Sequence, residues 1–353
     1  MDAQVGQKQF IPWADLIRVV ATLLVITVHV SGQLTNAWGT VPNSDWFIAN
    51  IYGSIARICV PLFFMISGYL LLPRTESLGT FYKKRLLKVV IPLVVWSLIY
   101  LGWYCGNHPG TCTPHLVQNL LFVNGAYYHL WFMYSLLGIY LILPVLRLMI
   151  RPNTDRRVLW YMVGLWLVFQ PILALARQFW DFSIRIQPPL ATGFVGLFIL
   201  GYLLGEWNLT HSRVILSGIV FFLATLVTIL GTYLMTRSAG KFDPFFYDLA
   251  GLFVILASAA AFLLLRWFAG TAFFASPGAH EGTRLLASAA FGIYILHVLV
   301  IEILQGWIPG LHLDAFIGNP IWSIPLVVAI VYVLSFLIVR LLQKIPVLNH
   351  IVP

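Results

Sequence analysis

Charged residues are scarce in this 353-residue chain, and their scarcity decides the class of protein. Asp, Glu, Lys and Arg make up 9% of the residues, whereas 60% are hydrophobic. A soluble globular chain carries about 25% charged and 45–50% apolar residues. So few charges cannot cover a surface exposed to water. The sequence therefore excludes an ordinary soluble domain and predicts an all-α protein embedded in a membrane.

Cysteine and the common cofactor motifs are also scarce. The three cysteines exclude a disulfide scaffold and an array of cysteine-ligated metal clusters. The sequence contains neither His-Glu-x-x-His nor the phosphate loop Gly-x-x-x-x-Gly-Lys-Ser/Thr, which argues against a zinc site of that type and against ATP-driven transport. The net charge of +9 is dispersed over the loops, as is typical of membrane topology. We therefore expect no bound metal and no nucleic-acid partner.

Ten apolar stretches are long enough to cross a bilayer, at about 20 residues per span. If loops alternate between the two sides, sixteen of the 21 Lys and Arg residues lie on the side of both termini, four lie opposite, and Arg57 lies within a span. Because Lys and Arg collect on the cytoplasmic side, both termini are predicted to be cytoplasmic. We expect a single domain over residues 1–353, surrounded by lipid and without a fused extracytoplasmic domain. The predicted spans are 13–32, 47–72, 82–103, 129–150, 157–176, 190–207, 213–236, 246–268, 285–307 and 321–342.

Two of the three cysteines fall in one outward loop, residues 104–128. Cys105 and Cys112 are separated by a stretch that contains glycine and proline and could close into a small ring. A disulfide is chemically reasonable there if the outer compartment is oxidising, and two free thiols are the alternative. Cys59 lies within the second span and is interpreted as a packing residue.

The first span carries three ionisable groups, and such groups in a transmembrane helix are functional candidates. Arg18 and His29 are eleven residues apart, so they return to nearly the same helix face about 16 Å apart along the axis. Asp15 joins that face. A cation would thus lie near the cytoplasm and a titratable base deep in the membrane. In the alternative interpretation, Arg18 reaches the interface beside Asp15 and His29 only packs between helices.

The second span and the loop after it provide further candidates. Arg57 lies in the outer half of that span, and Ser67 and Gly68 are small enough to allow close approach of a helix or ligand. A basic cluster follows at the start of the third span. It could bind phosphate, or it could simply follow the positive-inside rule and hold lipid head groups. Its members are Lys83, Lys84, Arg85 and Lys88.

Polar and aromatic residues near the outer face form the last group. Tyr128, His129 and Trp131 suit sugar binding, and an interfacial aromatic belt explains them equally well. Glu302 lies inside the ninth span, where we expect it near the acceptor or paired with Arg57. His297, on another face of that helix, is interpreted first as a packing residue. Gly201 and Gly205 form a small-x-x-x-small pair typical of helix packing.

Five motifs in this order resemble the acyltransferase 3 family of membrane O-acyltransferases. Within that family the chain is most similar to stand-alone bacterial O-acetyltransferases of surface glycans. Each motif is short, and the resemblance extends over essentially the whole chain. They are Arg18-x10-His29, Phe63-Phe64-x-x-Ser67-Gly68, the basic entry to the third span before Pro92, Tyr128-His129-Leu130-Trp131-Phe132, and Phe291-Gly-Ile-Tyr-Ile-Leu-His297.

The resemblance implies transfer of an acyl group, commonly acetyl, from cytoplasmic acetyl-CoA to a hydroxyl of a periplasmic or lipid-linked glycan. His29 would then be the general base, and Arg57 or Ser67 would stabilise the oxyanion. The bacterial inner membrane is the expected location. Phosphates of the donor would be held by Arg18, Lys83, Lys84, Arg85 and Lys88, and the acceptor by Tyr128, His129, Trp131 and Glu302.

Two other classes of protein compete with this interpretation. A transporter or flippase for a glycan or small molecule also needs buried charges, although internal repeats, frequent in transporters, are not evident between residues 1–176 and 177–353. A scaffold subunit of a polysaccharide-synthesis complex would not need the Arg18–His29 face. The sequence leaves open acetyl or succinyl as the acyl group, the acceptor glycan and its hydroxyl, direct transfer or an acyl-enzyme, and the oligomeric state.

Overall fold

The computed structural model describes residues 11–108, 110, 112–113, 118, 125–150, 155–186, 188, 193–274 and 276–353. Every regular element in these ranges is a helix, and nine helical segments are long and apolar enough to cross a membrane. The prediction of an all-α, multi-pass architecture is thereby confirmed. The side of the membrane on which the termini lie stays a prediction.

The long segments include several that consist of more than one helix. The first five segments are α1 (Pro12–Thr35), α2 with α3 (Asn43–Ala56, Cys59–Leu71), α4 (Leu78–Asn107), α6 (Trp131–Leu148) and α7 with η1 and α8 (Arg156–Leu167, Val168–Ile172, Leu173–Trp180). The other four are α10 (His211–Ala239), η2 with α11 (Phe245–Tyr247, Leu252–Phe268), α12 with η3 (Pro277–Glu302, Ile303–Trp307) and α13 (Pro320–Gln343), which the short η4 (Leu348–His350) follows.

The predicted span 190–207 differs from the other nine. Its described part forms α9, Val195–Gly205, a helix of 11 residues, and residues 190–192 lie outside the described ranges. Eleven residues rise about 16 Å, roughly half of the ~30 Å hydrocarbon core. Nearly all side chains of α9 are buried. The expected count of ten spans therefore stays a prediction, and α9 is a short internal helix.

Glycine allows α9 to lie directly against α3. A Cβ atom on Gly68 would lie 1.8 Å from the carbonyl oxygen of Phe198, and one on Gly201 would lie 2.1 Å from that of Met65. A Cβ atom on Gly205 would likewise lie 2.0 Å from the ring of Tyr69. No side chain fits between these backbones, so small residues are required at this crossing. The packing role predicted for Gly201 and Gly205 is confirmed.

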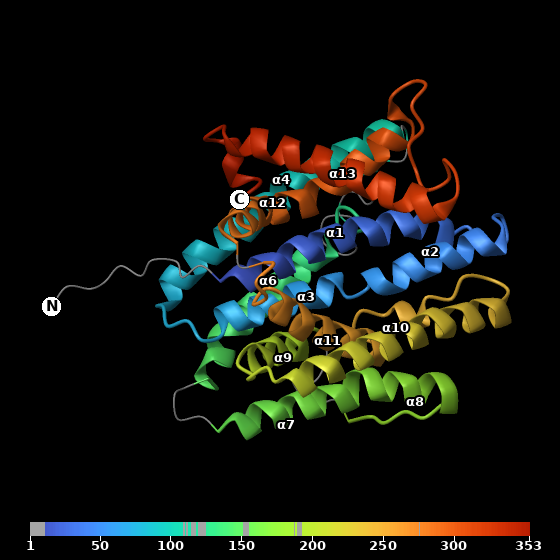
Figure 1. Ribbon diagram of the computed structural model, residues 1–353. Coiled ribbons are helices and arrows are strands. Elements are labelled where there is room, and N and C mark those ends of the chain that lie inside the picture. The colour runs from blue at the N-terminus through green and yellow to red at the C-terminus, as the bar shows by residue number, and fades with distance from the viewer. Residues whose placement is uncertain are drawn as a thin grey trace.

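The bundle is arranged around α1 (Figure 1). This helix packs against α2, α3, α11, α12 and α13. In Figure 1, α4, α12 and α13 lie on one side of α1, and α10, α7 and α8 lie on the other. The beginning of α1 and the end of α13 lie at the same end of the bundle, whereas α4 ends at the opposite end. We refer to these as the Arg18 end and the His29 end of α1.

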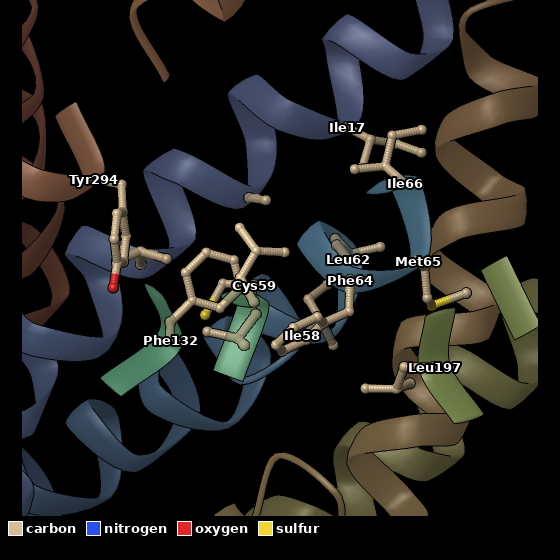
Figure 2. Close-up of a cluster of buried hydrophobic side chains, with 14 of the residues drawn as sticks. Ile17, Ile58, Cys59, Leu62, Phe64, Met65, Ile66, Phe132, Leu197 and Tyr294 are labelled. Carbon is tan, nitrogen blue, oxygen red and sulfur yellow. The ribbon is translucent and has the colours of Figure 1, made fainter. Parts of the chain in front are cut away.

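A buried apolar core surrounds the middle of α1 and α3 (Figure 2). Ile17, Leu62 and Phe64 have no exposed surface, and Phe64 stacks on Phe194 with ring centroids 4.7 Å apart. Further along this core, the rings of Phe132 and Tyr294 lie 5.2 Å apart, near Cys59 in Figure 2. Cys59 is buried and unpaired, in agreement with a packing role.

The helix of the second span is interrupted at Arg57. Helix α2 ends at Ala56 and α3 begins at Cys59. Pro61 explains the break, because proline has no N–H to donate to the carbonyl of residue 57 and its ring displaces that carbonyl. Broken helices of this kind place polar groups inside a bundle. The break therefore fixes where the Arg57 side chain leaves the helix.

The two cysteines of the loop after α4 form a disulfide. Cys105 and Cys112 are bonded, with their Cα atoms 5.6 Å apart. The bond ties the loop to the last turn of α4. The sequence left open a disulfide or two free thiols, and the structure has the disulfide.

Candidate active site

Three histidines from distant parts of the sequence meet at the His29 end of α1. The ring centroids of His29 and His297 lie 5.1 Å apart, and those of His129 and His297 lie 5.4 Å apart. Tyr128 completes the group, at 5.3 Å from His29 and 5.7 Å from His129. The four rings form a closed circuit, which we call the histidine cluster. It joins α1, the residues just before α6, and α12.

His297 is held rigidly by its own helix. It has no exposed surface, and its Nδ1 atom lies 2.6 Å from the carbonyl oxygen of Tyr294 and 3.2 Å from that of Ile293. The hydroxyl of Tyr294 in turn donates a hydrogen bond to the backbone carbonyl of His129. One turn of α12 thus positions two members of the cluster.

His129 is positioned from the other side by the same turn of α12. Its Nε2 atom lies 3.2 Å from the carbonyl oxygen of Ile295, and its ring packs at 4.9 Å against Tyr100. The Tyr100 hydroxyl donates to the same carbonyl at 2.7 Å and accepts from the backbone N–H of Leu299 at 3.2 Å. Helix α4 therefore supports the cluster through Tyr100.

Glu302 lies beside the cluster and is bound by neutral donors. The indole N–H of Trp103 donates to Oε2 at 2.6 Å, and the hydroxyl of Tyr127 donates to Oε1. The suggested pair with Arg57 is wrong, because both carboxylate oxygens face α4 and the segment before α6. Burial, followed by the charge of Glu302, raises the pKa of Tyr128. The Tyr128 phenol therefore keeps its proton at neutral pH and can donate a hydrogen bond.

Arg57 lies at the break between α2 and α3. Its guanidinium lies 4.1 Å from the ring centroid of Tyr247, whose hydroxyl donates to Oδ1 of Asn50 at 2.7 Å. The Nε atom of Arg57 is buried and has no hydrogen-bond partner among the described residues. A cationic donor with an unpartnered N–H is thus held inside the bundle, at the break between α2 and α3.

The Arg18 end of α1 carries a second group of charges. Arg18 pairs with Asp15 at 2.6 Å, as the alternative interpretation of the first span suggested. Arg147 pairs with Glu76 at 3.1 Å. Burial lowers the pKa of Arg74, and the positive charges of Arg85, Arg147 and Arg18 act in the same direction. We call these four arginines, Arg18, Arg74, Arg85 and Arg147, the arginine cluster.

The basic residues predicted from the third span divide into two groups. Arg85 is half-buried and belongs to the arginine cluster. Its Nε atom is buried and has no hydrogen-bond partner in the described ranges. The side chains of Lys83, Lys84 and Lys88 are exposed on α4. Arg74 and Arg147 had been counted only as topology signals, because nothing in a single sequence shows that their loops meet Arg18.

Two other predicted residues lie outside the histidine cluster. Ser67 is half-buried in α3, ten residues after Arg57, so the two are about 15 Å apart along the helix direction. They cannot both face one reacting oxygen. Trp131, the first residue of α6, packs on Phe194 with ring centroids 5.6 Å apart. The structure places both residues but does not bring them together with His29.

A cavity of about 610 Å³ lies at the Arg18 end of α1. Trp13, Arg266 and Trp267 contribute to its lining, and the Arg266 guanidinium there donates to the backbone carbonyls of Leu204 and Trp207. The cavity does not touch the histidine cluster. Within the described ranges, no group of three or more His, Cys, Asp or Glu side chains has an arrangement that could hold a metal ion.

The sequence matches a known family over most of its length. Residues 11–340 match the acyltransferase 3 family, described as an acyltransferase domain. The chain belongs to this family. The resemblance to the acyltransferase 3 family inferred from the five motifs is confirmed.

Curated relatives carry a different name. An amino-acid racemase of Enterococcus faecalis is 27% identical over 365 residues, which covers 96% of this chain and 47% of the relative. A serine/alanine racemase of Enterococcus gallinarum is 27% identical over 281 residues, 72% of this chain and 37% of the relative. The chain thus spans less than half the length of these relatives. No solved structure gives a significant match.

Proposed function

We propose that this protein moves an acetyl or similar short acyl group from acyl-CoA to a hydroxyl of a glycan across the membrane, with His29 as general base. The single observation that carries the proposal is the construction of α1. Arg18 and His29 lie eleven residues apart on this helix, about 16 Å along its axis. One belongs to the arginine cluster and the other to the histidine cluster.

The arginine cluster is suited to the phosphates of the donor. Guanidinium groups bind phosphate through two parallel hydrogen bonds. Within the part of the chain that the structure describes, ion pairs with Asp15 and Glu76 offset two of the four positive charges. The exposed Lys83, Lys84 and Lys88 add to the attraction for an anionic donor. The pantetheine arm of CoA, comparable in length to this part of α1, would then carry the thioester toward His29.

The chemistry at the other end needs one base and one oxyanion donor. His29 takes the proton of the acceptor hydroxyl as its oxygen attacks the thioester carbonyl, the C–S bond breaks, and the same proton passes to the departing thiolate. Arg57 would stabilise the oxyanion, because its buried Nε has no hydrogen-bond partner among the described residues. The placement of Ser67 along α3 makes it the weaker candidate for this role.

The acceptor would enter from the His29 end. Tyr128 and His129 belong to the histidine cluster itself. Beside the cluster, Glu302 accepts a hydrogen bond from Trp103, and Trp103 packs against Trp307. The side chain of Trp307 is 57% exposed. Aromatic faces with adjacent polar groups suit sugar rings. Trp131 would extend this surface. The disulfide at the same end of the bundle supports an oxidising outer compartment, in keeping with a glycan acceptor outside the bacterial inner membrane.

Binding of acetyl-CoA to the purified protein in nanodiscs tests the proposal. We expect saturable binding by calorimetry that weakens in Arg18→Ala. Arg157→Ala is the matched control, because Arg157 is exposed at the start of α7 and is not part of the arginine cluster. Absence of binding to the wild-type protein at millimolar acetyl-CoA would contradict the proposal and favour a transporter of glycans or small molecules.

A further inference from the structure

Two nitrogen atoms in the histidine cluster have no role in the mechanism above. Nε2 of His297 and Nδ1 of His129 are both buried, and neither has a hydrogen-bond partner among the described residues. His297 is 0% exposed and His129 is 2% exposed. Buried polar atoms are nearly always satisfied in proteins, and an exception calls for an explanation.

The other nitrogen of each ring decides which hydrogen-bonding role these atoms have. Nδ1 of His297 faces the carbonyl oxygens of Tyr294 and Ile293, and a carbonyl oxygen only accepts, so Nδ1 carries the proton. The neutral ring then has a lone pair on Nε2. The same argument gives His129 a proton on Nε2, which faces the carbonyl of Ile295, and a lone pair on Nδ1.

The two rings that carry these lone pairs belong to the same circuit of four rings as His29. His297 is 5.1 Å from His29 between centroids, and His129 adjoins both His297 and Tyr128. The cluster therefore holds two hydrogen-bond acceptors that the backbone of α12 has oriented and that no donor from the described residues occupies. A ligand group that satisfies them must carry donor hydrogens. Carboxylates and phosphates have none to offer.

We propose that His297 Nε2 and His129 Nδ1 bind the acyl acceptor directly, by accepting hydrogen bonds from its hydroxyl groups, and thereby orient the reacting hydroxyl against His29. This inference rests on the proposed acyl transfer and narrows its substrate. The acceptor has several neighbouring hydroxyls, as a sugar ring has, and presents them to the cluster. His297 is then a binding residue and not only a packing residue.

Asparagine and glutamine separate this role from a structural one at each histidine. The amide of Asn can occupy the position of Nδ1, and that of Gln the position of Nε2. At position 297, Gln retains the acceptor toward the ligand, whereas Asn retains only the bond to the helix carbonyls. At position 129 the relation is reversed, because there Nδ1 is the free acceptor and Nε2 makes the backbone bond.

The experiment measures transfer of label from [1-14C]acetyl-CoA to glycan in membranes of the producing cells, which contain the natural acceptor. We expect His297→Gln and His129→Asn to retain a transfer rate within about tenfold of wild type. At each position the other variant, His297→Asn or His129→Gln, should be at least tenfold slower than its counterpart. The affinity for acetyl-CoA should be the same in these variants as in wild type. The thermal unfolding of each variant in detergent is also measured, to identify variants that fail to fold.

The outcomes are distinct. The opposite pattern, with Asn tolerated at 297 and Gln tolerated at 129, assigns both nitrogens to structure and overturns the inference. Equal rates for the two variants at each position overturn it as well. If wild-type membranes transfer no label, the proposed function itself fails, whatever the variants do.

Discussion

The imidazole rings of His29 and His297 lie 5.1 Å apart between centroids, although 268 positions separate them in the sequence. They project from α1 and α12, two helices that pack against each other along the centre of the bundle. Because both rings sit on long regular helices and not on loops, their separation is set by helix packing. Such rigid support is what a general base requires to meet its substrate reproducibly.

Removal of the His29 imidazole is expected to abolish transfer while leaving the fold intact. A positioned general base contributes about 10²–10⁴-fold in rate, and His29 is only half-buried, so its loss leaves no large cavity. The measurement compares acetyl transfer and thermal unfolding of His29→Ala with wild type. Loss of activity together with loss of stability would assign His29 to packing.

Acetyl-CoA affinity is expected to depend on Arg85 far more than on Lys84. Arg85 belongs to the arginine cluster, whereas Lys84 is exposed on the same helix. We expect Arg85→Gln to raise the apparent KM for acetyl-CoA about tenfold, Lys84→Gln to raise it less than threefold, and the double variant to follow Arg85→Gln. If the KM of the double variant equals that of wild type, these residues serve topology alone.

Substitution of Gly68 by alanine should destabilise the protein strongly. Its Cβ would lie 1.8 Å from the carbonyl oxygen of Phe198, so α3 and α9 would have to separate, at a cost of about 1–3 kcal/mol or more. Gly218 in α10 is the control, since a Cβ there meets nothing within 4 Å, and Gly218→Ala should be neutral or stabilising. The unfolding temperature in detergent measures both, and equal values would refute the close contact.

Alkylation and mass spectrometry should find the disulfide in the native protein. Cys105 and Cys112 are bonded and should react with a thiol reagent only after reduction. Cys59 is buried in the core and should react only after unfolding. Modification of Cys105 in the absence of reductant would show that the loop is open, and with it the argument for an oxidising outer side would fall.

Relationships within a single helix were predictable from the sequence. The shared face of Asp15, Arg18 and His29 follows from the period of 3.6 residues, and the contact between Arg18 and Asp15 is present. The packing of Gly201 likewise follows from local spacing. Composition alone indicated a helical membrane protein. In each case the physical determinant acts over a few residues, or over the chain as a whole, and can be counted directly.

Relationships between helices were decided by the tertiary structure. Glu302 faces Trp103 and Tyr127 and not Arg57, Arg74 and Arg147 join Arg18, and His129 and His297 meet His29. No periodicity encodes these meetings, because they depend on which helix faces pack and at what angle. The sequence by itself determined the membrane-embedded helices and the polar face of α1, and only their packing brought three histidines into one cluster.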